Sequence, residues 1–190
     1  MLDQGGFTET SEWTQIMSEI RYAIQSIVWP PESEYFIINP SKKGNGVKPI
    51  KYSCMGVLSG LFGWSLEAPV VINQDNQTGK VDALRTTFTG DIAFEWETGN
   101  ISSSHRALNK MALGIVQGSL IGGIIVLPTR ELYRYLTDRI GNYEELAPYF
   151  PIWRNMTIPQ GFIMVIAIEH DGISSSAPLI PKGTDGRALI

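Results

Sequence analysis

The segment Asp91-Ile-Ala-Phe-Glu-Trp-Glu97 carries the clearest structural pattern in the chain. Apolar and acidic residues alternate along it, which is typical of a β-strand whose two faces meet different surroundings. Phe94 and Trp96 would pack into a core on one face. Glu95 and Glu97 would then project together from the other face, roughly 7 Å apart. The segment therefore predicts a central strand that carries two carboxylates.

The sequence on either side of this strand predicts an α/β domain. A helix is expected to begin near Ser103, and the apolar run at residues 121–127 predicts a second strand after it. Further helices are expected at residues 13–27 (capped by Thr8 or Ser11), 49–65 and 129–140, and further strands at 35–38 and 162–168. We therefore expect one domain over residues 1–190, with a mixed central sheet flanked by helices.

Composition and charge limit the class of protein. A chain of 190 residues with 43% hydrophobic residues can bury a full core. Its net charge of −4 counts weakly against nucleic-acid binding, because a nuclease can confine its positive charge to one cleft. The single cysteine, Cys54, excludes an intramolecular disulfide framework. With no apolar run of membrane-spanning length and no signal peptide, we expect a cytoplasmic protein without a membrane partner.

The paired carboxylates indicate a metal site. Glu95 and Glu97 on one face would repel each other and lose hydration, so they need a cation or a solvated cleft. Oxygen ligands at this density suit Mg²⁺. Asp82 is expected just after a polar turn and Glu67 at the end of the second helix. An Asp followed by Glu-x-Glu is typical of nucleases in which the first two acids hold a metal and the last activates water. Asp91, on the same face, is an alternative aspartate.

Other readings of these carboxylates stay open on the residues alone. An edge strand with a solvated charged face would show the same alternation. A glycosidase also uses paired carboxylates, and a separation of roughly 7 Å would suit an inverting one. A DNA-binding module without cleavage is a further alternative, and loss of an acidic ligand would be its sign.

Five segments carry a resemblance to a known family. Residues 94–110, which read Phe-Glu-Trp-Glu-Thr-Gly-Asn-Ile-Ser-Ser-Ser-His-Arg-Ala-Leu-Asn-Lys, closely resemble the BamHI-type type II restriction endonucleases. Further matches follow in the same order along nearly the whole chain, at residues 28–31, 45–51, 135–150 and 177–186. Gln117 departs from the family, which has a histidine there in the region of its subunit contact.

The resemblance implies a fold, a reaction and a set of catalytic residues. The fold would be the restriction-endonuclease-like PD-(D/E)XK core. The enzyme would be a homodimer in a bacterial restriction–modification system, cutting double-stranded DNA at the palindrome GGATCC after the first G to leave 5′ overhangs. Asp82, Glu95 and the backbone carbonyl of Trp96 would hold one Mg²⁺, and Glu67 with Asp82 a second. Glu97 would be the general base.

The resemblance also implies the DNA-binding residues. Base edges in the major groove would be read by Asn100, Ser102, Arg106, Asp138 and Arg139. Arg suits guanine, Asn suits adenine, and Asp can accept from cytosine. Lys51 would contact a phosphate near the scissile bond, and Gly183 and Arg187 would lie at the minor groove. For the dimer interface we expect the helices at residues 103–118 and 129–140.

Overall fold

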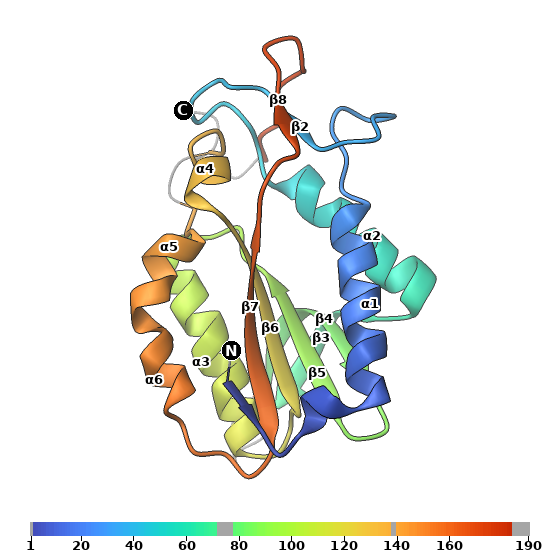
Figure 1. Cartoon of the computed structure of the whole chain (residues 1–190), viewed down its shortest axis with the longest axis vertical. Coiled ribbons are helices and arrows are strands. Elements are labelled where there is room, and N and C mark those ends of the chain that lie inside the picture. The colour runs from blue at the N-terminus through green and yellow to red at the C-terminus, as the bar shows by residue number, and fades with distance from the viewer. Residues whose placement is uncertain (1, 72–77, 138–139, 184–190) are drawn as a thin grey trace.

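A six-stranded mixed sheet forms the centre of the computed structural model, which describes residues 2–71, 78–137 and 140–183 (Figure 1). In order across the sheet the strands are β1 (Leu2–Gln4), β7 (Gly161–Ile168), β6 (Gly122–Pro128), β5 (Asp91–Trp96), β4 (Thr78–Thr86) and β3 (Ser65–Val71). β5, β6 and β7 are parallel to one another, and the remaining neighbours pair antiparallel. The mixed sheet expected from the sequence is confirmed.

Helices cover both faces of the sheet, as Figure 1 shows. α1 (Ser11–Gln25) and α2 (Lys48–Phe62) pack on one face, while α3 (Ile101–Val116), α5 (Tyr143–Leu146) and α6 (Phe150–Arg154) pack on the other. Short 3-10 turns, η1 (Phe7–Glu9) and η2 (Ala147–Tyr149), precede α1 and α6. α4 (Arg130–Tyr133) follows β6, and β2 (Ile37–Ile38) pairs with β8 (Gly172–Ile173) in a small parallel sheet.

β6 joins the two cores because it is buried on both faces. Ile124 and Val126 pack against the α1 and α2 side, while Ile125 and Leu127 pack against the α3 side. A parallel strand covered by helices on both sides needs such a continuous apolar run. Of the helices that the structure describes, none is long and apolar enough to cross a bilayer.

The end of the second helix differs from the prediction. α2 stops at Phe62 because Gly63 adopts a left-handed conformation (φ 70°), which closes the helix as its C-cap. Glu67 therefore lies inside β3 and not at a helix end. Asp82 likewise lies within β4. The antiparallel β3–β4 pair was missed from the sequence because polar residues interrupt its apolar pattern.

Two further local predictions were wrong. α1 is capped by Thr10, whose hydroxyl accepts the Trp13 N–H, whereas the Thr8 hydroxyl donates to Asp3. Of the helix expected at residues 129–140, only α4 is helical among the residues that the structure describes. The chain leaves the helix because Asn45 pairs with the backbone beyond it: Asn45 N–H donates to the Tyr135 carbonyl, and Asn45 accepts from Thr137.

Candidate active site

The regular backbone pairing of β4 with β5 ends just before Asp82. Regular pairing runs from Thr86↔Asp91 to Ala83↔Phe94 and stops there. Beyond it, the Asp82 carboxylate accepts the Trp96 N–H at 2.8 Å, and the Asp82 N–H donates to the Glu95 carboxylate at 3.4 Å. Side-chain oxygens thus take the place of backbone carbonyls. The two strands part where the carboxylates begin, and a cleft opens between β5 and α3.

Two lysines from opposite helix layers contact these carboxylates. Lys51 of α2 places its Nζ 2.5 Å from Asp82 Oδ1. Lys110 of α3 donates to Glu95 Oε1 and to the backbone carbonyl of Lys80. All four charged side chains are less than one fifth exposed. Each carboxylate is therefore neutralised by one ammonium group in a poorly hydrated place.

The environment raises the pKa of both glutamates. Burial raises the pKa of Glu95 to about 7; the hydrogen bond from Lys110 lowers it, and the nearby Asp82 charge raises it. Burial also raises the pKa of Glu97, against the opposing effect of its hydrogen bond from Gly99. Carboxylates that are desolvated and repelled by a third one are suited to binding a cation or accepting a proton.

Glu97 is held by the turn that follows β5. Its Oε1 accepts the Gly99 N–H at 2.6 Å, and its own N–H donates to the Val126 carbonyl at 3.0 Å. A Cβ at Gly99 would lie 2.8 Å from this same Oε1 and 2.7 Å from the Ser103 hydroxyl. Glycine at this position therefore lets the turn close tightly over Glu97 before α3 begins.

The cleft has a volume of about 970 Å³ and joins the carboxylates to α3. Asp82, Glu95 and Glu97 line one side of it, and Arg106 and Lys110 line the other. Lys51, Ser102 and the backbone around Trp96 complete the lining. The cleft therefore brings acidic, basic and hydroxyl groups together along one surface.

The start of α3 presents polar side chains to solvent. Asn100 caps the helix by accepting the Ser103 N–H at 3.2 Å, and Arg106 Nη2 lies 3.4 Å from the Ser103 hydroxyl. Asn100, Ser102 and Arg106 are all exposed. Because a helix start is favourable for anions, this end of α3 can accept phosphate or polar base edges.

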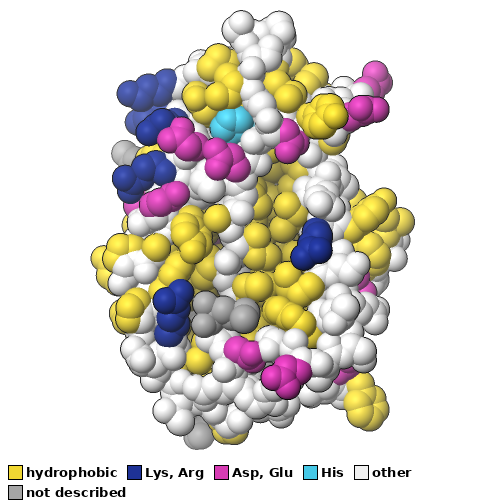
Figure 2. Space-filling view, in the orientation of Figure 1, with side chains coloured by type: hydrophobic (Ala, Val, Ile, Leu, Met, Phe, Trp, Pro, Cys, Tyr) yellow, Lys and Arg dark blue, Asp and Glu magenta, His cyan; other side chains and the backbone are white. Residues whose placement is uncertain are grey.

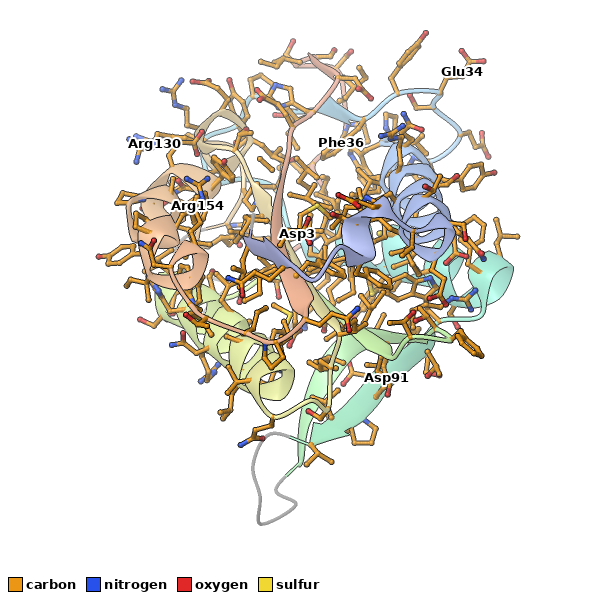
Figure 3. All side chains as sticks on the ribbon, turned by 60° about the horizontal axis from the view of Figure 1, so that its bottom comes forward. Asp3, Glu34, Phe36, Asp91, Arg130 and Arg154 are labelled. Atoms are coloured by element: carbon orange, nitrogen blue, oxygen red, sulfur yellow. The ribbon has the colours of Figure 1, made fainter. Side chains whose placement is uncertain are left out.

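Neither Glu67 nor Asp91 is among the residues that line this cleft. Counting from the pairs Leu66↔Ala83 and Ala68↔Val81, Glu67 lies opposite Asp82 in the β3–β4 register, is exposed, and has a left-handed φ of 50°. Asp91, labelled in Figure 3, lies at the far end of β5. There it lines a separate pocket. The structure thus sets Asp82 beside Glu95 and leaves the alternative Asp91 outside the cleft.

The donor chemistry fits Mg²⁺. Asp82 and Glu95 offer carboxylate oxygens. The Trp96 carbonyl faces the same strand edge as its N–H, which bonds to Asp82, because both groups of one residue in a strand point the same way. Within the described part of the chain, no three Asp, Glu, His or Cys side chains already surround one point as metal ligands would. Ion pairs to Lys51 and Lys110 hold the carboxylates instead.

Some expected residues cannot be placed and one useful residue was missed. Asp138, Arg139 and Arg187 lie outside the described residues. Gly183 is half-buried, and a Cβ there would approach the Lys48 side chain to 3.0 Å. Lys110 was not predicted, although its spacing of four residues from Arg106 places both on one face of α3.

Known proteins are similar to this chain over most of its length. The family model described as "Restriction endonuclease BamHI" matches residues 1–187. The type II restriction enzyme OkrAI of Oceanobacter kriegii is 50% identical over 174 residues, covering 92% of this chain and 89% of its own. The type II restriction enzyme BamHI of Bacillus amyloliquefaciens is 39% identical over 179 residues, covering 90% of this chain and 82% of its own.

Proposed function

The chain belongs to the BamHI family of type II restriction endonucleases, and from this premise we propose that it cuts double-stranded DNA at GGATCC in a Mg²⁺-dependent reaction. Cleavage after the first G would leave 5′ overhangs. The proposal also includes a PD-(D/E)XK core over residues 1–190 and a place in the bacterial cytoplasm. The enzyme is a site-specific deoxyribonuclease, so the alternatives of a non-cleaving DNA-binding module and a non-DNA hydrolase are not retained.

The observation that carries this proposal is the meeting of Asp82 and Glu95 where the β4–β5 ladder opens. Asp82, Glu95 and the Trp96 carbonyl would hold one Mg²⁺, and Glu67, opposite Asp82, would contribute to a second. When bound, Mg²⁺ supplies Lewis-acid stabilisation of the charge that develops on the phosphate and the leaving oxygen. Mg²⁺ is usually bound by one or two carboxylates together with oxygens of the substrate phosphate, and this site offers such carboxylates.

The chain's own residues divide the remaining work. Glu97 would accept a proton from the attacking water, and its raised pKa supports this role because a general base works best near the operating pH. The Gly99 N–H holds its carboxylate in place. Lys51 would exchange its contact with Asp82 for a phosphate near the scissile bond.

DNA recognition is assigned to the mouth of the cleft. The residues that would read base edges are Asn100, Ser102 and Arg106, at the start of α3. Their exposure supports this assignment, because the major groove of DNA is wide enough to admit an α-helix. Asp138 and Arg139 would add base contacts, and Gly183 and Arg187 would lie at the minor groove.

We extend the proposal to a two-fold homodimer, the simplest partner for a palindrome. α3 carries both cleft residues and the exposed Leu113 and Val116, and Ile152 of α6 is 62% exposed. Figure 2 shows hydrophobic side chains along the edge formed by α5 and α6. Pairing through α3 and α6 would cover this apolar surface and bring two clefts together. Of the second expected interface helix, at residues 129–140, the described residues form only the short α4.

Plasmid digestion tests the proposal. The purified protein with Mg²⁺ should cut a plasmid of known sequence at GGATCC only, and excess EDTA should stop it. Glu95→Ala should lose cleavage while still binding the cognate duplex, whereas Glu34→Ala, an exposed acid on a distant loop, should cut normally. Cleavage by Glu95→Ala at the wild-type rate would refute the metal-site assignment.

A further inference from the structure

Lys110 occupies a position that the proposed catalysis leaves unexplained. Its Nζ donates to Glu95 Oε1 and to the Lys80 carbonyl, and its side chain is 18% exposed. Desolvating an ammonium group is costly unless acceptors surround it, so these two contacts hold the lysine in the site.

The contact has a counterpart at the neighbouring carboxylate. Lys51 pairs with Asp82 as Lys110 pairs with Glu95, and the two lysines come from α2 and α3, on opposite faces of the sheet. A divalent cation bound at Glu95 would repel the Lys110 ammonium group and compete with it for the same negative charge. Binding of a metal at Glu95 would therefore weaken the contact between Glu95 and the Lys110 ammonium.

We propose that Lys110 is a positioning residue that holds Glu95 until a divalent cation takes that carboxylate, and then moves its ammonium into the cleft to bind a DNA phosphate. This inference rests on the proposed role of Glu95 as a metal ligand. The flexible four-carbon stem of lysine permits the move. Arg106, one turn earlier on α3, lines the same cleft, so the released ammonium extends a basic track along the helix.

Chemical labelling of the free protein tests the exchange directly. With an amine-acetylating reagent and mass spectrometry, Lys110 should be labelled slowly in EDTA and several-fold faster in saturating Mg²⁺. Lys80 is exposed and should be labelled at one rate in both, which makes it the internal control. In Glu95→Ala, Lys110 should be labelled fast with or without Mg²⁺, because its carboxylate partner is gone.

DNA binding tests the second half of the proposal. Lys110→Met should lower the salt dependence of cognate binding, measured with Ca²⁺ in place of Mg²⁺, by about one counterion per subunit. Lys80→Met removes the same charge nearby and should leave that slope unchanged. Equal slopes for wild type and Lys110→Met, or an equal drop in both variants, would overturn the phosphate contact.

The outcomes separate this inference from the catalytic proposal. Suppose Mg²⁺ raises the melting temperature of the wild type but not of Glu95→Ala, while Lys110 labelling stays the same with and without Mg²⁺. The metal site would then stand, and the exchange of Lys110 would be wrong. The exchange of Lys110 is supported if Lys110 is labelled faster in Mg²⁺ and if Lys110→Met lowers the salt dependence of DNA binding.

Discussion

The carboxylate of Asp82 accepts the main-chain N–H of Trp96 at 2.8 Å. The side chain of Asp82 in β4 thus accepts a hydrogen bond from the backbone of β5, just beyond the last regular pair of the β4–β5 ladder. The contact fixes Asp82 beside Glu95 and turns the Trp96 carbonyl toward the same edge. One hydrogen bond therefore couples the shape of the sheet to the arrangement of the proposed ligands.

Two substitutions at Asp82 should separate its charge from its hydrogen bond. Asp82→Asn keeps an oxygen acceptor for the Trp96 N–H, whereas Asp82→Ala leaves that N–H without it. Both should lose cleavage, but we expect Asp82→Ala to be less stable than Asp82→Asn by about 1–3 kcal/mol, the cost of a half-buried donor left unpaired. Urea unfolding measures the difference, and equal stabilities would show that the contact contributes nothing.

The raised pKa of Glu95 predicts a pH-dependent stability of the metal-free protein. Because its folded pKa of about 7 lies above the ordinary 4.5, the folded state binds the extra proton between these values. Stability should therefore fall as the pH rises from about 4.5 through 7, by at most about 3 kcal/mol from this group. Glu95→Gln in EDTA should flatten this part of the profile. If the free energy of unfolding of Glu95→Gln, measured by denaturant melts, depends on pH as strongly as that of the wild type, the prediction is wrong.

The backbone of Glu67 should be strained, and its carboxylate should be needed for cleavage. Its φ of 50° is unfavourable for any residue with a Cβ and costs on the order of 1 kcal/mol. Glu67→Gly should stabilise the metal-free protein by about that amount while slowing Mg²⁺-dependent cleavage. Glu67→Ala loses the same carboxylate but keeps the strain, so it should slow cleavage without the gain in stability. A Gly variant no more stable than the Ala variant would remove the strain argument.

Arg106 should contribute to sequence discrimination. Arg106→Ala should cost roughly 1–3 kcal/mol of cognate over non-specific binding, the value of a bidentate guanine contact. Arg21→Ala, an exposed change on α1 in the opposite layer, is the control and should leave both affinities alone. Gel-shift titrations on both duplexes measure the ratio. If Arg106→Ala weakens the two equally, its partner is a phosphate.

The proposed dimer surface should be sensitive to charge. Ile152→Glu places a carboxylate on the exposed apolar face of α6 and should shift the protein to a monomer in sedimentation experiments. Leu61→Glu, at a residue 64% exposed on α2, provides the matched control and should leave the dimer intact. A wild-type monomer, or an Ile152→Glu dimer of undiminished affinity, would exclude this interface.

Local pattern was sufficient for the elements around the site. Alternation along residues 91–97 predicted β5 and the shared face of Glu95 and Glu97, and Phe94 and Trp96 are buried on the opposite face as expected. The apolar runs of β6 and β7 and the helical stripe of α1 were equally readable. These features depend only on the spacing of apolar and polar residues within one segment, because that spacing shows which side chains share a face.

Pairing over long sequence separation decided the rest. Asp82 and Asp91 were both acceptable partners for Glu95 by sequence, and only the β4–β5 register places Asp82 there and Asp91 at the far end of the strand. The same holds for Lys110, which meets Glu95 because α3 packs back over β6, the neighbour of β5. Local periodicity was enough to show which residues share a strand face or a helix stripe. Which carboxylate meets which lysine follows from strand register and helix packing, and these are set by contacts that no local period records.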